Sequence, residues 1–225
     1  MYANKTNKTR LHIEFDKLAN AFAPNSQARE AMSNENRHRN RNFEVICYDE
    51  NRVRLSSLNG SSYINATKIK GYELTHSEFI ITQDPLPNTT FEFWKMITEC
   101  ECNVVVALNK DYERDESVYW PSEENPVVVS EVEEHKYVVQ LIKTPAKSDK
   151  EAKTTLNEFV TRRQFEITET KYSSTSKMIV THFVYNEKWP EDTAPQQRAN
   201  FISLVNQVQK AASEYNRTCV VVHAL

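Results

Sequence analysis

The sequence predicts an α/β protein with a twisted mixed β-sheet flanked by helices. Two short β-branched runs, at 103–109 and 219–223, are typical of strands buried on both faces of a parallel sheet. Strand-like runs between 127 and 185 and three segments predicted as helices supply the remaining layers. Because 225 residues can bury one sizeable core, we expect a single domain over 1–225.

The first quarter of the chain predicts one helix and a strand pair. Four apolar residues at helical spacing precede Pro24, which predicts an amphipathic helix near 11–22, packed on the body. The basic stretch 34–42 is expected to be solvated. Residues 43–55 are expected to form two strands about a turn. The apolar face of the helix consists of Leu11, Phe15, Leu18 and Phe22.

The remaining sequence predicts strands, two helices and one irregular, solvated segment. Thr89 and Glu92 have capping-box spacing at the start of the helix 88–99, and the helix 201–215 carries a clear apolar stripe. Residues 143–157 lose the apolar pattern and are expected to be a solvated excursion. Strand segments are expected at 62–72, 78–87, 103–109, 127–142 (a hairpin), 159–169, 176–185 and 219–223. Antiparallel pairing is expected in the middle, with parallel pairing at 103–109 and 219–223.

Charge and hydropathy restrict the partners and the compartment. Lysine and arginine total 28 against 31 acidic residues, so the net charge of -3 gives no reason to expect nucleic acid as a partner. The polar N-terminus and the lack of a long apolar run predict neither a signal peptide nor a membrane span. We therefore expect a cytoplasmic protein.

The four cysteines do not resemble a disulfide framework, which also favours a reducing compartment. Cys100 and Cys102 have the spacing of half a metal site, but no second pair follows, so we expect neither a metal nor a cofactor. Cys219 lies in an apolar run, where a thiol behaves as a small hydrophobe. Gly60 and Gly71 are the only glycines, and neither belongs to a phosphate-cradling pattern.

Six motifs, in order along the chain, are similar to those of the phosphotyrosine-specific protein tyrosine phosphatases. They are RNRNFEVICYDENRVRL, SYINATKIKGY, FIITQDPLPNTTFEFWKM, VYWP, WPED and VVVH. The resemblance covers about Phe15 to His223 and implies the family's twisted mixed sheet with flanking helices. It also implies a cysteine nucleophile directly after the VVVH strand, followed by a phosphate-binding loop with glycine and arginine.

The nucleophile position of this resemblance is Ala224, and the sequence stops at Leu225. A thiolate must attack phosphorus, donors must hold the dianion, and an acid must protonate the leaving oxygen. The resemblance therefore predicts a C-terminally incomplete domain, which lacks the catalytic loop and the closing helices and is inactive as it stands.

The motifs that face the substrate in the family also differ in this sequence, and these differences likewise predict an inactive domain. The family's W-P-D acid is Glu191, whose extra methylene displaces the carboxyl, so we expect a vestigial general acid. The family's N-R-Y is Asn40-Arg41-Asn42, which lacks the aromatic platform, and its D-Y-I-N-A begins with Ser62 and Tyr63. We expect Arg41, Asn42, Ser62 and Tyr63 to form a degenerate recognition loop.

Two further substitutions place acids where the family has lysine or glycine. Asp115 precedes the VYWP motif, and Asp84 replaces the glycine of T-Q-G-P, so both are expected to add negative charge near a bound dianion. These features resemble the membrane-distal second domains of receptor tyrosine phosphatases, which are mostly weak or inactive and serve regulation. Such a domain is expected to bind a protein partner, for example another phosphatase domain, and to bind phosphotyrosine peptides weakly or not at all.

Two other interpretations of the sequence stay open at this point. The chain is a fragment of an active phosphatase whose catalytic loop lies elsewhere, or it is a remnant without a stable fold. Asn42, Ser62, Glu191 and Ala224 all lie within the sequence and favour the inactive, partner-binding interpretation.

Overall fold

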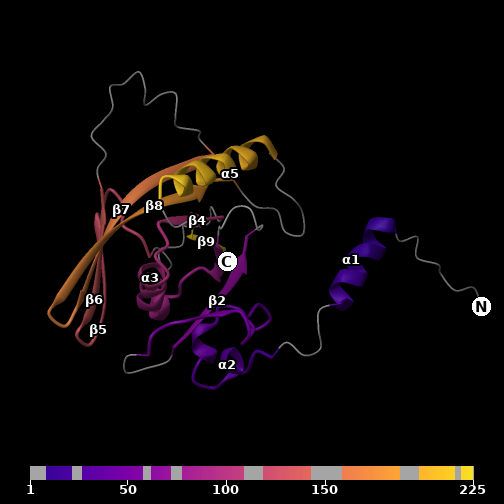
Figure 1. The fold of residues 1–225 in the computed structure, drawn as a ribbon, viewed down its shortest axis with the longest axis horizontal. Coiled ribbons are helices and arrows are strands. Elements are labelled where there is room, and N and C mark those ends of the chain that lie inside the picture. Colours follow the sequence, from indigo (N-terminus) through magenta and orange to yellow (C-terminus); the bar gives the residue numbers. More distant parts are fainter. Residues whose placement is uncertain are drawn as a thin grey trace, which may run out of the picture.

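The described part of the chain is built from strands and helices around one sheet (Figure 1). The computed structural model describes residues 9–21, 27–57, 62–71, 78–108, 119–142, 159–187, 198–215 and 219–224. The helices are α1 (Arg10–Ala21), α2 (Arg29–Met32), η1 (Arg37–Arg39), η2 (Pro87–Thr89), α3 (Thr90–Glu99) and α5 (Arg198–Ser213). The strands are β1 (Arg52–Arg54), β2 (Tyr63–Lys70), β3 (Glu78–Gln83), β4 (Val104–Ala107), β5 (Val127–Val132), β6 (His135–Leu141), β7 (Val160–Lys171), β8 (Ser174–Tyr185) and β9 (Cys219–Ala224).

The strands form one mixed sheet in the order β1-β2-β3-β9-β4-β8-β7-β6-β5. The pairs β3–β9, β9–β4 and β4–β8 are parallel, and the other described pairs are antiparallel. The α/β fold with a twisted mixed sheet is therefore confirmed. The expected parallel pairing at 103–109 and 219–223 is confirmed by β4 and β9, and the strands β5 to β8 in the middle of the chain pair antiparallel except where β8 meets β4.

The last strand, β9, lies in the centre of the sheet between β3 and β4. Alternate residues of β4 and β9 face opposite layers: Val105 and Val221 belong to the cluster that includes α3. Val104 and Val220 belong to the cluster that includes α5. Figure 1 shows these two helices on either side of the sheet. The run Val220–Val222 is apolar throughout because both faces of the strand are covered.

Two N-terminal expectations are wrong. Residues 43–48 form no strand, because the Asn65 amide bonds to this segment instead: Cys47 N–H donates to Asn65 Oδ1 at 2.9 Å. The stretch 34–42 is not simply solvated, since Asn36 and Asn40 are buried. Arg39 also pairs with Glu92 across 2.5 Å. Side-chain hydrogen bonds of this kind leave no periodic signal in a sequence.

The two predicted helix details also need correction. The helix α1 forms at Arg10–Ala21, but its first apolar residue, Leu11, is 75% exposed and is not packed on the body. The N-cap of α3 makes no side-chain hydrogen bond, because Thr89 Oγ1 accepts from Leu86 N–H within η2. The hairpin 127–142 is confirmed as β5 and β6. The excursion 143–157 lies outside the described residues.

One cysteine pair corrects the expectation that the chain lacks disulfides. Cys102 and Cys219 are joined by a disulfide with a Cα–Cα distance of 4.7 Å and a sequence separation of 117. They lie close together because Val104 and Val220 are partners in the β4–β9 pairing, and Cys219 directly precedes Val220 while Cys102 lies two residues before Val104. Cys219 is therefore half of a cross-link between two central strands. Cys47 and Cys100 are free, and burial raises the pKa of both thiols.

None of the described helices has the length and apolar character needed to cross a membrane. Within the described residues, no group of three or more histidine, cysteine, aspartate or glutamate side chains is arranged to hold a metal ion.

Candidate functional site at the end of the central strand

The candidate site lies at the carboxyl end of β9, where ligands bind in open α/β sheets. Ala224 is the partner of Gln83 in the β3–β9 pairing. Its carbonyl oxygen accepts from Asp84 N–H at 2.8 Å, and the His223 carbonyl accepts from Leu108 N–H at 3.0 Å. Hydrogen bonds to segments on both sides thus fix this end of the strand.

His223 is held inside the protein by two polar partners. Its Nδ1 is hydrogen-bonded to Asp84 Oδ1, and its Nε2 lies 2.6 Å from Tyr119 Oη. The edge of its ring packs against Phe93, with ring centroids 5.7 Å apart. His223 is 1% exposed and Asp84 is 2% exposed. Both imidazole nitrogens are therefore engaged in the interior rather than directed to a ligand.

The position of Asp84 differs from the sequence-based expectation. We expected its carboxylate to add charge toward a bound dianion, but it points to buried His223 instead. The sequence did carry a signal for this contact, since a buried histidine requires polar partners and the family has glycine at position 84. The sequence analysis missed Tyr119 as the second partner.

A second buried histidine lies beside this network. His182 Nε2 is 3.4 Å from Tyr119 Oη, and the residue is fully buried. Burial lowers the pKa of His182 well below its ordinary value, and the nearby charges of His223 and Arg163 act in the same direction. His182 is therefore neutral at physiological pH and does not supply a cation for anion binding.

A cavity of about 230 Å³ opens at the end of β9 and includes Ala224 in its wall. Its polar lining comes from Arg41, Asn42, Asn65, Thr67, Thr82 and Gln83, and the rest from Val45, Ile46, Cys47, Ile81 and Ala224. The Ala224 side chain is a methyl group, which is not a nucleophile. We call this space the Ala224 cavity.

Arg41 and Asn42 line the Ala224 cavity but are engaged with the protein backbone. The Arg41 guanidinium donates to the carbonyl oxygens of Asp84 at 3.3 Å and of Pro85 at 3.2 Å. The Asn42 amide oxygen accepts from Glu44 N–H at 2.8 Å, which forms a local turn. Anion binding by Arg41 would therefore compete with two existing hydrogen bonds.

Ser62 and Tyr63 are not among the residues that line the Ala224 cavity. The Ser62 carbonyl oxygen accepts from Leu55 N–H at 3.1 Å and from Arg52 at 3.3 Å. Tyr63 is 0% exposed, and its hydroxyl donates to Asn40 Oδ1 at 2.5 Å. Desolvation by burial, the largest cause, raises the pKa of Tyr63 well above its ordinary value.

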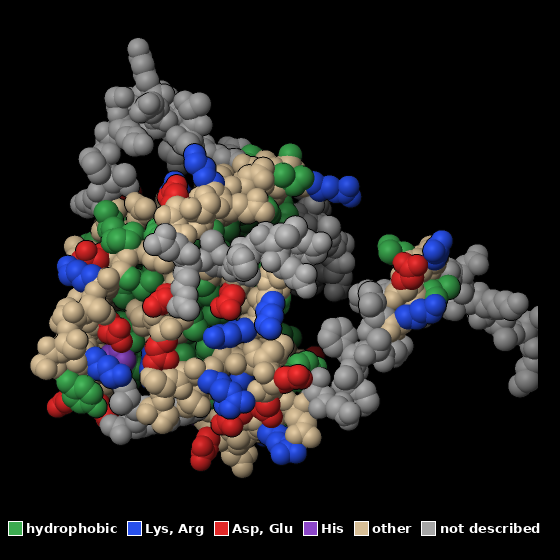
Figure 2. Space-filling model, viewed as in Figure 1, with side chains coloured by type: hydrophobic (Ala, Val, Ile, Leu, Met, Phe, Trp, Pro, Cys, Tyr) green, Lys and Arg blue, Asp and Glu red, His purple; other side chains and the backbone are tan. Residues whose placement is uncertain are grey.

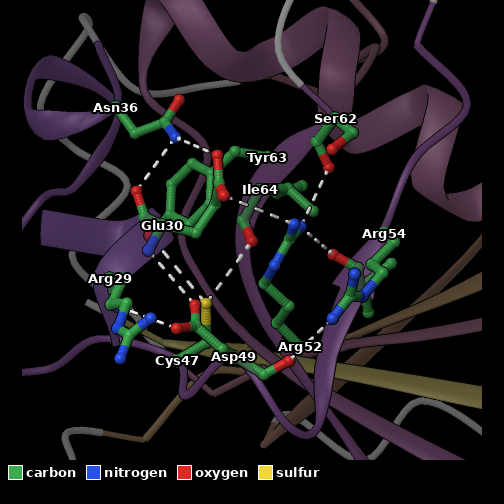
Figure 3. Close-up of polar contacts among 11 residues, drawn as sticks. Arg29, Glu30, Asn36, Cys47, Asp49, Arg52, Arg54, Ser62, Tyr63 and Ile64 are labelled. Atoms are coloured by element: carbon green, nitrogen blue, oxygen red, sulfur yellow. Dashed lines mark hydrogen bonds and ion pairs between the residues drawn. The ribbon is translucent and has the colours of Figure 1, made fainter. Parts of the chain in front are cut away.

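Tyr63 belongs to a buried polar cluster around Cys47, which Figure 3 shows together with Arg52. Cys47 Sγ lies 3.9 Å from Tyr63 Oη and 3.7 Å from the Ile64 carbonyl oxygen. This cluster ties the loop before β1 to the start of β2. Of the predicted site residues, the structure brings Arg41, Asn42 and Ala224 together at one cavity, and it places Ser62 and Tyr63 elsewhere. Glu191 and Asp115 lie outside the described residues.

Comparison with known proteins shows the family to which this chain belongs. The family model for protein-tyrosine phosphatase matches residues 36–225, so the chain belongs to the protein-tyrosine phosphatase family. The solved structure of PTPN18 in complex with HER2-pY1196 phosphopeptides has a TM-score of 0.72 over 94% of this chain and 69% of that chain, with 23% identity. That likeness shows the fold.

Curated relatives include receptor-type enzymes. The chain is 34% identical over 208 residues to Tyrosine-protein phosphatase 69D of Drosophila melanogaster, covering 89% of this chain and 13% of that protein. It is 33% identical over 198 residues to human Receptor-type tyrosine-protein phosphatase zeta, covering 84% and 8%. It is 31% identical over 182 residues to rat Tyrosine-protein phosphatase non-receptor type 2, covering 80% and 39%. The chain thus spans well under half the length of each relative.

Proposed function

We propose that this chain is a non-catalytic member of its family that acts by binding a protein partner. The observation that carries the proposal is Ala224 at the end of β9, in the wall of the cavity. Hydrolysis through a cysteinyl-phosphate needs a nucleophilic sulfur at that point. A methyl group forms no bond to phosphorus, so the first chemical step is missing.

The surroundings of Ala224 support the same proposal. Asn42 offers no aromatic face for phosphotyrosine, and its amide is used in a local turn. The Arg41 guanidinium is bound to two backbone carbonyl oxygens. Charge-assisted hydrogen bonds to phosphate are the strongest contacts available to a phosphopeptide, and here they would replace existing ones. We also propose that Glu191, at the position of the family's general acid, is vestigial.

The partner that we propose is another phosphatase domain, by analogy with second domains of receptor-type enzymes. The similarity to receptor-type relatives supports this choice. A cytoplasmic location follows from the same analogy. The alternative is that the chain belongs to a longer phosphatase whose activity lies in another domain, since Ala224 itself is not a nucleophile.

A matched pair of peptides tests the binding side of the proposal. We expect a phosphotyrosine peptide and its unphosphorylated form to bind with affinities that differ by less than about tenfold, or ~1.4 kcal/mol. Titration calorimetry at moderate salt measures both affinities. A preference for the phosphorylated peptide above tenfold that disappears in Arg41→Ala would show a working phosphate site and overturn the proposal.

A further inference from the structure

The sheet formed by the described residues has two edges, and only one of them is protected against pairing. At one edge, β1 has three residues, two of them arginines, and its register with β2 shifts between Arg52 and Arg54. Short length, charge and irregular register are the usual means by which edge strands avoid pairing with other chains. At the other edge, β5 has six residues that pair with β6 in continuous register. We call the outer side of β5 the β5 edge.

The β5 edge presents backbone groups that β6 does not use. Leu141 N–H donates to the Pro126 carbonyl oxygen at 2.9 Å, so these two residues are a hydrogen-bonded pair. Such pairs alternate along an antiparallel ladder, so every second residue counted from Pro126 bonds to β6. The N–H and C=O groups of Val127, Val129 and Glu131 therefore point outward, and they have no hydrogen-bond partner in the part of the chain that the structure describes.

The side chains at the β5 edge favour an extended ligand that is partly apolar. Val127 is 44% exposed and Val129 is 53% exposed. Since side chains alternate along a strand, both lie on one face of the sheet, where Val129 is directly opposite Val138 of β6. Apolar side chains of an added strand would pack beside them, as cross-strand neighbours do. Figure 2 shows apolar side chains among charged ones at the side of the molecule where Figure 1 places β5 and β6.

The charges of this segment indicate which kind of strand fits. Residues 122–134 contain five glutamates and neither lysine nor arginine. Neighbouring strands offset part of this charge: Lys136 lies 3.7 Å from Glu131, and Arg163 and Lys171 belong to β7, which still leaves the segment acidic. A second copy of the chain would bring the same five glutamates to this edge, so like charges oppose pairing between copies. A strand that carries lysine or arginine is attracted instead.

We propose that the β5 edge binds an extended segment of a partner protein, which adds to the sheet as a further strand. The backbone of the segment bonds to Val127, Val129 and Glu131, as in other cases of strand addition. Its alternate apolar side chains pack beside the exposed valines, and lysine or arginine near its ends meets the glutamates. The proposal does not depend on the loss of catalysis at Ala224, because a chain with a nucleophile there would present the same edge.

The test is amide hydrogen exchange of the 225-residue chain, followed by NMR with and without the capped peptide KKVTVTVKK. In the free chain, the amides of Val127, Val129 and Glu131 should exchange at least tenfold faster than those of Val128 and Ser130, which donate to β6. The peptide should slow the three outward amides at least tenfold in a saturable way. The same peptide with N-methylated valines lacks the donors that face β5 and should bind at least tenfold more weakly. Equal protection by the two peptides, or no protection at millimolar peptide, would overturn the proposal.

Two variants test the assigned contacts. Val129→Pro removes an outward N–H that β6 does not use, so it should keep the fold and weaken the peptide at least tenfold. The double variant Glu124→Gln, Glu131→Gln should weaken it at least threefold, whereas Glu50→Gln, an exposed glutamate outside this segment, should leave the affinity unchanged. Wild-type affinity in both the proline variant and the double variant would contradict the proposal.

Sedimentation of the chain without peptide separates a partner segment from a second copy. We expect a monomer, because the glutamates of two copies repel each other at this edge. A dimer that Val129→Pro dissociates would show that a second copy occupies the β5 edge, and the assignment to a partner protein would then be wrong.

Discussion

Replacing Asp84 by alanine is expected to lower the free energy of unfolding by about 3 kcal/mol, because it leaves a buried histidine without its partner. Asp84 is 2% exposed and His223 is 1% exposed, so water cannot readily take the place of the carboxylate. Asp84→Asn keeps an acceptor for His223 Nδ1 and should cost about 1 kcal/mol. Urea unfolding followed by tryptophan fluorescence measures both differences.

An exposed carboxylate provides the matched control. Glu124→Ala should change the free energy of unfolding by no more than about 0.5 kcal/mol, since Glu124 lies on the surface. Tyr119→Phe removes the other polar contact of His223 and should also destabilise the fold. An Asp84→Ala variant as stable as the wild type would mean that the Asp84–His223–Tyr119 network does not support the end of β9.

The substitution Ala224→Cys is expected to leave the 225-residue chain inactive as a phosphatase. A catalytic thiol needs a lowered pKa, which nearby cations or backbone donors provide. Here the adjacent residue, His223, is hydrogen-bonded to the Asp84 carboxylate, and the Arg41 guanidinium is bound to carbonyl oxygens. Negative charge nearby raises a thiol pKa rather than lowering it. We expect hydrolysis of p-nitrophenyl phosphate within twofold of the wild-type rate.

The rate at which the introduced thiol of the Ala224→Cys variant is alkylated measures its pKa and does not require catalytic turnover. Its dependence on pH should give a thiol pKa at or above the ordinary value of about 8.5. Ala224→Ser is the control for both assays, since it matches the size without the sulfur. Turnover in Ala224→Cys that is absent from Ala224→Ser would show that the existing site can activate a nucleophile.

The regular elements could be predicted from the sequence because each has a periodic or compositional signal. The run Val220–Val222 identified β9 as a strand buried on both faces, and the apolar stripe of residues 201–215 identified α5. The strand-like run at 127–142 predicted a hairpin, which the structure shows as β5 and β6. In these segments the burial of side chains determines the structure, and the spacing of apolar residues in the sequence predicts which side chains are buried.

The irregular N-terminal region could not be predicted in this way. Residues 43–48 alternate like a strand, yet the Asn65 amide holds them as a loop through Cys47 N–H and the Val45 carbonyl oxygen. Asn36 and Asn40 look like solvated residues, yet both are buried with their amides bonded to backbone carbonyls. One amide can satisfy several backbone groups, and the sequence gives no sign of which ones.

The candidate site was predicted only in part for a related reason. The motifs grouped Arg41 and Asn42 with Ser62 and Tyr63 in one recognition loop, whereas the structure brings Arg41 and Asn42 to one cavity with Ala224. The role of Asp84 depends on where His223 points, and that is a matter of three-dimensional packing. The Cys102–Cys219 disulfide depends in the same way on the pairing of β4 with β9.

Release of phosphate from a phosphotyrosine peptide by the unmodified 225-residue chain tests the central claim most directly. The claim is that Ala224, at the end of β9, leaves the site without a nucleophile. An active member of the family serves as the positive control in the same assay. We predict that release by this chain equals that of a heat-treated sample at every protein concentration. Steady release that rises in proportion to protein concentration would contradict the claim.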